Sequence, residues 1–284
     1  MLEEVLELPK LPPRSPDGHK GDYGRILVIA GSRGMSGAAV LCGSAALRGG
    51  GGLVRLAVPH DILPIAAAGN PCYMTVPLSQ DGDGRIHLSA LEEVQRLVAE
   101  NDVIALGPGL GRSADLDRLV VDLLRNTSKP MVVDADALNA LSRDVAALKN
   151  HAGPIVITPH PGEFARLLGT TIPAVQGERR DNAARFAADN GVIVVLKGRG
   201  TIVTDGRQWF ENTTGNPAMA TGGTGDVLTG LIAALLGQGL EPFAAAQLGV
   251  HVHGLAGDLV RDELGIGLCA SDLLDFLPHA LRRC

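Results

Sequence analysis

The sequence predicts an α/β protein with a mostly parallel central sheet and helices on both of its faces. Short apolar runs rich in β-branched residues recur along the 284 residues, and each leads through a glycine-rich or polar loop into a helix-forming segment. The chain shows no internal repeat and no linker between two such blocks. We therefore expect a single domain over 1–284, in which residues 1–23 form an extended arm interrupted by prolines.

Composition narrows the class of protein and its surroundings. The net charge of -6, without a basic stripe, argues against a nucleic-acid partner. The four cysteines are scattered and form no CxxC pair, so neither a zinc site nor a disulfide framework is indicated. The acidic, proline-rich start resembles no signal or transit peptide, and no apolar run approaches the ~18 residues of a membrane span. We expect a cytoplasmic protein without a membrane partner.

The expected elements alternate along the chain. Continuous apolar runs such as Arg25–Ala30 predict strands that are buried on both faces. Ser36 and Ser271 are the expected caps of the first and last helices. Strands are predicted at 25–30, 53–58, 103–106, 131–136, 154–158 and 192–196, followed by a hairpin at 202–211. Helices are predicted at 37–48, 114–125, 176–190, 227–236, 242–264 and 270–281.

A glycine cluster at 222–225 lies directly before the buried helix over 227–236. The first N–H groups of a helix have no intrahelical partner and carry partial positive charge, and glycine lets a ligand approach them closely. Such a helix start can hold a phosphate or a developing oxyanion. Asp226 falls in the first turn, where its carboxylate could accept a proton beside that anion. The alternative is that Asp226 only complements the helix dipole.

Three further loops follow predicted strands, at the edge where open α/β sheets bind ligands. Residues 107–111 have the sequence GPGLG, which lacks the GxGxxG spacing of dinucleotide-binding loops and could be a simple turn. Asp134 ends a strand and either lines a site or caps the next helix. His160 stands between two prolines that hold it stiffly, which favours a ligand contact over a structural role.

Lys197 opens a fourth loop, KGRGT, after the most strongly apolar strand. A lysine beside two glycines suits a nucleotide phosphate, although a solvated lysine at a strand end would show the same pattern. The sequence GxxxxGK[ST] does not occur, so the chain is not a P-loop protein. His251 and His253 do not share a helix face, which argues against a metal pair.

Six motifs together resemble a known family. The segment 222–226 is similar to the anion-hole signature of the ribokinase-like superfamily, in which the Asp is the catalytic base and the backbone N–H groups hold the transferring phosphoryl. The full set, in the expected order over most of the chain, resembles the ADP/ATP-dependent NAD(P)H-hydrate dehydratases. The motifs are HKGDYGRILVIAGS (19–32), GPGLG (107–111), DADALN (134–139), TPHPGEFARL (158–167), KGRGT (197–201) and NPAMATGGTGDVLTG (216–230).

The resemblance implies a repair enzyme. NADH and NADPH can add water across a nicotinamide double bond, and this family removes it from the S-epimer of the hydrate. ADP or ATP phosphorylates the hydroxyl, and phosphate, a better leaving group than water, departs as the double bond re-forms. Bacterial-type single-domain members favour ADP as the donor, which would give AMP. Mg²⁺ is expected on the grounds of phosphoryl-transfer chemistry, although the sequence shows no ligand cage for it.

The resemblance also implies roles for individual residues. Asp226 would take the proton from the hydrate's hydroxyl group. The N–H groups of Gly223, Thr224 and Gly225 would stabilise the phosphoryl oxygens. The residues implied to contact the NAD(P)H hydrate are Ala39, Gly109, His160 and Asp226. The residues implied to contact the nucleotide are Lys197, Gly198, Arg199, Gly200, Thr201 and Gly225.

Two alternatives stay open from the residues alone. The same fold and anion hole could serve a kinase that acts on a vitamin-precursor alcohol or a sugar. The protein could also be a sensor that binds nucleotides without catalysis. The family resemblance further implies a homotetramer and cooperation with a separate NAD(P)H-hydrate epimerase.

Overall fold

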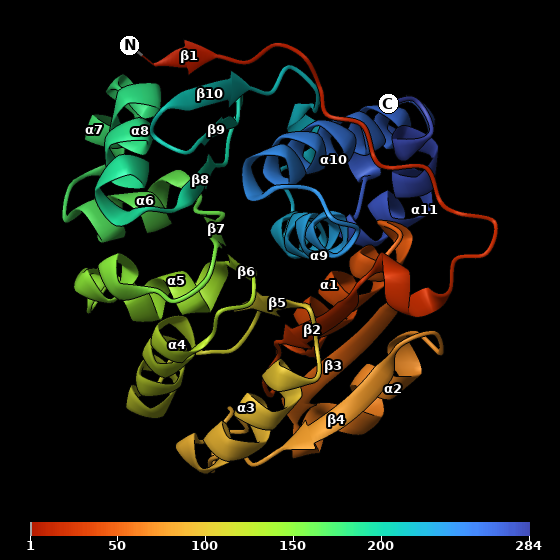
Figure 1. Cartoon of the computed structure of the whole chain (residues 1–284), viewed down its shortest axis with the longest axis vertical. Helices are drawn as coiled ribbons and strands as arrows, with labels where there is room; N and C mark the ends of the chain where they lie inside the picture. Colours follow the sequence, from red (N-terminus) through yellow and green to blue (C-terminus); the bar gives the residue numbers. More distant parts are fainter. Residues whose placement is uncertain (1) are drawn as a thin grey trace.

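The computed structural model describes residues 2–284, which form one ten-stranded sheet (Figure 1). The strand order is β1-β10-β9-β8-β7-β6-β5-β2-β3-β4. Neighbouring strands are parallel except that β9 runs antiparallel to β8 and β10, which confirms the predicted mostly parallel sheet. The strands are β1 (Glu3–Glu4), β2 (Arg25–Ile29), β3 (Leu53–Pro59), β4 (Met74–Leu78), β5 (Val103–Leu106), β6 (Met131–Val133), β7 (Ile155–Ile157), β8 (Ile193–Leu196), β9 (Ile202–Thr204) and β10 (Gln208–Glu211).

Helices cover both faces of the sheet, as the sequence predicts (Figure 1). The first face carries α1 (Ser36–Arg48), α2 (Leu63–Gly69), α9 (Thr224–Gly237), α10 (Pro242–Leu264) and α11 (Ala270–Leu281). The second face carries α3 (Leu91–Ala99), α4 (Ala114–Asn126), α5 (Ala135–Leu141), α6 (Pro161–Leu168), α7 (Ile172–Gly177) and α8 (Arg179–Asn190). The result is a three-layer arrangement with one hydrophobic core on each side of the sheet.

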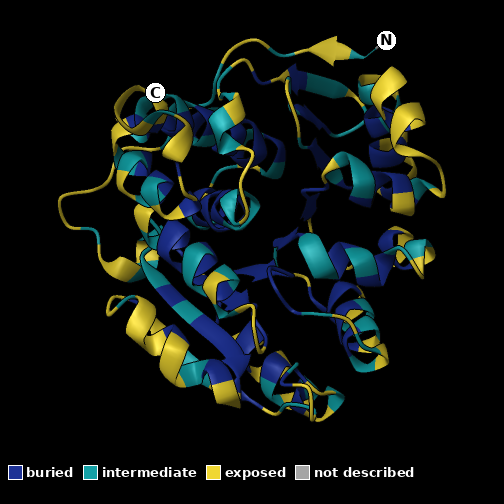
Figure 2. Ribbon diagram, turned by 180° about the vertical axis from the view of Figure 1, so that it is seen from behind, coloured by how far each residue is buried: buried dark blue, intermediate teal, exposed yellow. Residues whose placement is uncertain are grey.

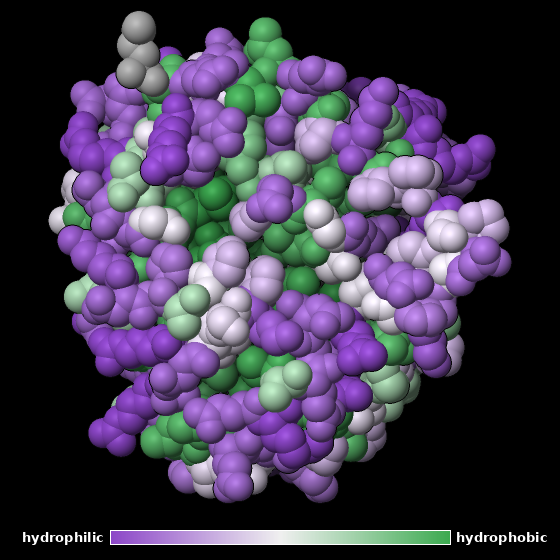
Figure 3. Space-filling model, viewed as in Figure 1, coloured by the Kyte–Doolittle hydropathy of each residue, from purple (hydrophilic) through white to green (hydrophobic). Residues whose placement is uncertain are grey.

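The alternation of side chains along each strand supplies both cores. In β2, Ile26 and Val28 pack into the core beneath α9, whereas Leu27 and Ile29 pack into the core beneath α4. Figure 2 shows the strands as a buried layer between helices whose outer sides are exposed. On the face drawn in Figure 3, hydrophilic side chains cover most of the surface. A strand that is apolar on both faces is therefore fixed between two helix layers.

Helix α9 lies in the interior, next to the sheet (Figure 1). Every residue from Val227 to Leu236 is buried, as expected for a helix that is apolar on all sides. Small residues let α9 approach α1 closely: a Cβ added at Gly230 would lie 2.0 Å from the carbonyl oxygen of Cys42. Because α9 also contacts β2, β5 and β6, its first turn has a fixed place relative to the sheet.

The structure corrects the predicted helix over 176–190 and both predicted serine caps. Residues 176–190 do not form one helix, because Glu178, with φ -138° and ψ 51°, separates α7 from α8. Ser36 is the first residue of α1 and makes no side-chain cap. Ser271 lies inside α11, where the cap consists instead of Cys269 and Asp272; the Asp272 carboxylate accepts the Cys269 N–H at 2.8 Å. The predicted serine caps are therefore wrong.

Two regions of the sheet also differ from the prediction. The strand expected over 131–136 ends at Val133, because Asp134 and Ala135 already turn into α5. The sequence analysis predicts no element for the segment 60–102, which contributes α2, β4 and α3. Strand β4 contains Pro77, which weakens a strand pattern in sequence and fits its place at the edge of the sheet.

The arm over residues 2–23 follows the surface and is tied down at several points. Strand β1 pairs in parallel with β10 at the sheet edge. The Glu7 carbonyl accepts a hydrogen bond from Gln247 of α10 at 2.9 Å, and the Arg14 guanidinium donates to the Gly50 carbonyl. A short 3-10 turn at Lys20–Tyr23 then leads into β2. Among residues 2–284, no helix combines the length and the apolar character needed to cross a bilayer.

Candidate active site

Helix α9 begins with an uncapped N-terminus at the carboxyl edge of the parallel strands. Its N-cap is Gly223, with φ 94°, and no side chain caps the first turn. Only glycine fits here, because a Cβ would lie 2.6 Å from Leu41 Cδ1 and the positive φ would be strained. The partial positive charge of the first-turn N–H groups is therefore available to an anion. This is the geometry that the sequence predicts for 222–225.

Asp226 lies in that first turn and is mostly shielded from solvent. Burial, followed by the negative charge of Asp134, raises the pKa of Asp226 to about 7, although Lys197 acts in the opposite direction. Asp136 and Glu163 add smaller effects of the same sign as Asp134. A carboxylate with a pKa near neutrality is well matched to accepting a proton at physiological pH.

The Asp134 side chain contacts Lys197 and Thr229 and does not cap α5. The residue occupies the N-cap position of α5 but makes no side-chain cap bond. Its carboxylate, 1% exposed, accepts hydrogen bonds from Lys197 Nζ to Oδ1 and from Thr229 Oγ1 to Oδ2, each at 2.8 Å. A Cβ added at Gly225 would lie 3.2 Å from Lys197 Nζ, so the ammonium lies beside the start of α9. Tertiary contacts, and not a bond to the start of α5, therefore hold the carboxylate in place.

His160 is the N-cap of α6, and its ring faces back onto the helix start. Its Nδ1 accepts the N–H groups of Gly162 at 3.0 Å and Glu163 at 3.3 Å, so the ring proton is on Nε2. Burial and the positive charge of Lys197 lower the pKa of His160, which keeps the ring neutral. The side chain remains half exposed. Its Nε2 lies 3.3 Å from Glu163 Oε1, so the ring proton faces that carboxylate.

Glu163 completes the charged cluster around Lys197. Its Oε2 accepts the backbone N–H of His160 at 2.8 Å and lies 4.0 Å from Lys197 Nζ. Burial raises the pKa of Glu163, and Asp134 acts in the same direction. Three carboxylates, from Asp134, Glu163 and Asp226, thus surround one ammonium group.

Arg179 forms hydrogen bonds to the backbone of the loop 197–201. The sequence analysis missed this residue. Its guanidinium donates to the carbonyl oxygens of Leu196 at 3.0 Å, Gly200 at 3.3 Å and Lys197 at 3.4 Å. These three carbonyl groups therefore point toward Arg179. The opposite side of the loop carries N–H groups and can bind a ligand. No local motif marks Arg179, because its contacts depend on the break between α7 and α8.

The GPGLG loop after β5 joins the loop after β2 where the strand order reverses, which is the usual ligand crevice of open α/β sheets. The Gly31 N–H donates to the Pro108 carbonyl, and Ser32 Oγ donates to the Gly109 carbonyl, both at 2.8 Å. Gly109 has φ 63°, which favours glycine. Ala39 is fully buried, so it presents no exposed atom to a ligand in this structure.

Asp136 links the two groups of predicted site residues. Its Oδ2 accepts the Gly111 N–H at 2.8 Å, and its charge contributes to the raised pKa of Asp226. The structure therefore brings the α9 start, Lys197 and His160 into one cluster, with the GPGLG loop connected to it through Asp136. Arg199 is exposed and has no such connection.

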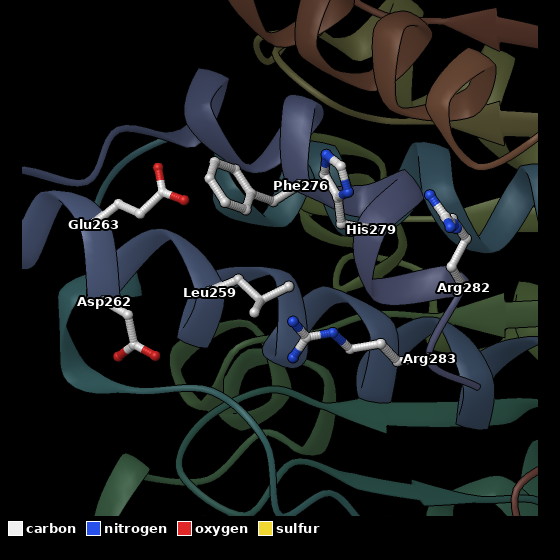
Figure 4. Close-up of a pocket in the computed structure, with 7 residues that line it drawn as sticks. All are labelled: Leu259, Asp262, Glu263, Phe276, His279, Arg282 and Arg283. Atoms are coloured by element: carbon white, nitrogen blue, oxygen red, sulfur yellow. The ribbon is translucent and has the colours of Figure 1, made fainter.

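A separate hollow of about 470 Å³ lies against the C-terminal parts of α10 and α11 (Figure 4). In the close-up, Leu259 and Phe276 lie between two acidic side chains and the basic side chains of the α11 end. No predicted site residue lines it, and its mixed charges favour neither an anion nor a cation. It is lined by Leu259, Asp262, Glu263, Phe276, His279, Arg282 and Arg283.

Comparison with known proteins agrees with this geometry. A family model described as NAD(P)H-hydrate dehydratase matches residues 26–279. The chain belongs to the NAD(P)H-hydrate dehydratase family. The match covers β3 to β10, all of β2 but its first residue, and every site residue described above.

Individual members of the dehydratase family match nearly all of the chain. A bifunctional NAD(P)H-hydrate repair enzyme of Moorella thermoacetica is 48% identical over 96% of the chain, which spans about half (52%) of that relative. An ADP-dependent (S)-NAD(P)H-hydrate dehydratase of Neisseria meningitidis is 39% identical over 96% of this chain and 90% of its own length.

Solved structures of the dehydratase family share the fold. The ADP/ATP-dependent NAD(P)H-hydrate dehydratase of Bacillus subtilis, co-crystallised with ATP and Mg²⁺, superposes with a TM-score of 0.82 at 32% identity, over 96% of this chain and 94% of that one. A ribokinase-like superfamily protein of Enterococcus faecalis also superposes, with a TM-score of 0.83 at 27% identity over 96% of this chain and 92% of that one, which confirms the predicted ribokinase-like α/β fold.

Proposed function

We propose that this dehydratase removes water from the S-epimer of hydrated NADH or NADPH, with ADP, or else ATP, as the phosphoryl donor. The observation that carries the proposal is the meeting of Asp226, the uncapped start of α9 and the Lys197 ammonium at one edge of the sheet. Relatives of similar length carry the same activity in their names. The function is repair of the nicotinamide nucleotide pool.

The first step is a proton transfer coupled to phosphoryl transfer. Asp226 takes the proton of the hydrate's hydroxyl group as its oxygen attacks the terminal phosphorus of the nucleotide. The N–H groups of Gly223, Thr224 and Gly225 stabilise the charge on the transferring oxygens. The bond from that phosphorus to the nucleotide breaks, and AMP leaves if ADP is the donor.

The second step is elimination from the phosphorylated hydrate. The C–O bond breaks with its electron pair going to phosphate, the neighbouring carbon releases its proton to water, and the electron pair of that C–H bond re-forms the nicotinamide double bond. Phosphate leaves more readily than water, so phosphorylation lowers the barrier to elimination. The anion-binding start of α9 would hold the departing phosphate as it held the transferring group.

The two substrates would approach the cluster from different loops. We assign the nucleotide to Gly225 and to the loop Lys197, Gly198, Arg199, Gly200 and Thr201. We assign the hydrate to Asp226, to Gly109 with the adjoining start of α1 that contains Ala39, and to the His160 ring. The exposed side of the 197–201 loop and the half-exposed His160 ring support this division.

Mg²⁺ would enter with the nucleotide. Among residues 2–284, no group of three His, Cys, Asp or Glu residues is arranged to hold a metal ion. Mg²⁺ commonly keeps several waters and binds through substrate phosphates, where it neutralises their charge. We therefore assign no protein ligand to Mg²⁺.

The proposal is tested by incubating the purified chain with S-NADH hydrate and either ADP or ATP. The expected result is the return of the reduced-nicotinamide absorbance, dependent on nucleotide and faster with ADP. The matched control is Asp226→Ala, which should give no return. Absence of turnover with both donors and with both NADH and NADPH hydrates would reject the proposal.

We also propose that residues 1–284 act as one catalytic unit, with residues 1–23 as an arm. The unit would form a cytoplasmic homotetramer and work with a separate epimerase that interconverts the two hydrate epimers. Relatives named as bifunctional repair enzymes support a functional link with another repair activity. Sedimentation of the purified chain tests the tetramer, since a monomer would contradict it.

A further inference from the structure

The buried carboxylate of Asp134 has no part in the chemistry above, although it is the least exposed charged side chain of the site. We propose that Asp134 is a positioning residue that clamps the Lys197 ammonium to the first turns of α9. The nucleotide loop and the anion-binding helix would then act as one unit. The inference rests on the proposed function, because it assigns Lys197 to the nucleotide.

Asp134 joins three elements that are far apart in the sequence. Its backbone follows β6, its Oδ1 accepts Lys197 Nζ from the end of β8, and its Oδ2 accepts Thr229 Oγ1 from α9. At 1% exposure, water does not compete for either oxygen, which makes these charge-assisted bonds strong. A displacement of the loop or the helix would break one of them.

The backbone that carries this carboxylate is held rigidly. The next residue, Ala135, has φ 49°, the one positive value among non-glycine residues of 2–284, and such strain persists only where the surroundings determine the conformation. The Asp134 N–H donates to the Leu106 carbonyl at 3.0 Å. On the other side, a Cβ added at Gly107 would lie 1.8 Å from the Asp134 carbonyl oxygen.

The clamp leaves Lys197 able to bind a phosphate. An ammonium has three N–H donors, and Asp134 takes one. Glu163, at 4.0 Å, lies beyond hydrogen-bond distance. The two remaining donors lie beside Gly225, where they and the helix N–H groups can bind the same anion. Without Asp134, the ammonium would face the positive end of the helix without a fixed partner.

A double-mutant cycle in the full chain tests the clamp. Calorimetry would measure the dissociation constant of ADP for the wild type, Asp134→Asn, Lys197→Met and the double variant. We expect each single variant to weaken ADP binding by about tenfold or more. We expect the double variant to bind within about threefold of Lys197→Met, because Asp134 acts through Lys197. Asp144→Asn, an exposed aspartate paired with Arg125, is the control.

The cycle separates positioning from a general effect on the fold. The clamp would be overturned if Asp134→Asn bound ADP within about twofold of the wild type. It would also be overturned if the losses of ADP affinity in the two single variants added in the double variant. If Asp134→Asn does not fold, Thr229→Val removes one anchor and keeps the ion pair. Weaker ADP binding with a cooperative unfolding transition supports the clamp in that variant, and unchanged binding overturns it.

A second readout separates failure of the clamp from failure of the proposed function. If the wild type binds neither ADP nor ATP, the proposed function fails, but the acetylation rate of Lys197 still reports its partner. Burial lowers the pKa of Lys197, yet Asp134 and Glu163 outweigh burial and raise it. Asp134→Asn should therefore speed acetylation at alkaline pH several-fold, measured by peptide mass spectrometry. An unchanged rate would overturn the clamp.

Discussion

His253 of α10 places its Nε2 2.8 Å from the carbonyl oxygen of Thr224, the first residue of α9. The ring nitrogen is the donor here, because a carbonyl oxygen can only accept. The bond ties the anion-binding helix start to the long helix that packs behind it. Burial lowers the pKa of His253 to about 4, so the neutral ring is the native form.

The first prediction concerns pH and stability. The unfolded His253 takes up a proton below about pH 6.5, whereas the folded one does so only near pH 4. Between about pH 6.5 and about pH 4 the unfolded state binds more protons than the folded state, so the free energy of unfolding falls as the pH falls. Urea unfolding should show that His253→Gln, which keeps a donor, loses about 2 kcal/mol less than the wild type between pH 7 and pH 5.

The control for this prediction is an exposed histidine. His60→Gln should lose stability in parallel with the wild type, because the His60 ring is largely in solvent. Equal pH dependence of the wild type and His253→Gln would contradict the assignment of a buried, neutral His253.

The second prediction concerns Asp226 as a base. Because its pKa is raised to about 7, the carboxylate is largely protonated below that pH and cannot accept a proton. Plots of log kcat/KM against pH should rise with unit slope below pH 7 and level off above it. Asp226→Asn should abolish turnover while calorimetry still detects ADP binding. An acid limb near pH 4 would disagree with a buried base.

The third prediction concerns the stability that the protein loses because the pKa of Asp226 is raised in the folded state. The folded state binds the Asp226 proton more tightly than the unfolded state, so stability falls as the pH rises from about 4 to about 7. Asp226→Asn removes this cost and should be more stable than the wild type at pH 8, by at most roughly 4 kcal/mol. The difference should vanish near pH 4. Chemical denaturation at both pH values measures it.

The parts of the site that form contiguous motifs could be predicted from sequence. The segment 222–226 combines a glycine cluster with an apolar helix, and both signals are local. The loops after β5, β7 and β8 were found because parallel strands place their carboxyl ends on one edge. Helix caps were predicted less well. The fold puts Met35 and Cys269, and not Ser36 and Ser271, at the N-cap positions of α1 and α11.

The supporting residues could not be predicted, because their partners are distant. Thr229 is 95 residues from Asp134 in sequence, and a threonine inside an apolar helix gives no signal of its own. Arg179 holds Gly200 from 21 residues away. Asp134 was recognised as a candidate, but only its burial and its bond to Lys197 distinguish a site residue from a cap.

The fourth prediction concerns space at the start of α9. A Cβ at Gly225 would lie 3.2 Å from Lys197 Nζ and 3.7 Å from Asp134 Oδ2. Gly225→Ala should therefore displace the ammonium and weaken ADP binding about tenfold, while the helix gains from alanine's higher propensity. Calorimetry and thermal unfolding measure the two effects. The control is Gly177→Ala, where a Cβ meets nothing within 4 Å. Lower stability with unchanged ADP affinity would contradict the prediction.

The last prediction concerns Arg179 and the shape of the nucleotide loop. Its planar guanidinium reaches the carbonyls of Leu196, Lys197 and Gly200 together, and the single ammonium of a lysine cannot reproduce this fork. Arg179→Lys should raise the KM for the nucleotide about tenfold or more and change kcat less, because the loop binds the donor without taking part in proton transfer.

Arg180→Lys is the matched control for that variant. Arg180 is exposed, pairs with Asp181 and lies over the Trp209 ring, away from the loop carbonyls. Its replacement should leave the KM within about twofold of the wild type, because exposed ion pairs contribute little. Steady-state kinetics with the nucleotide varied at saturating hydrate gives both constants. A fall in kcat at unchanged KM in Arg179→Lys would mean that the loop positions the reacting groups and not the nucleotide.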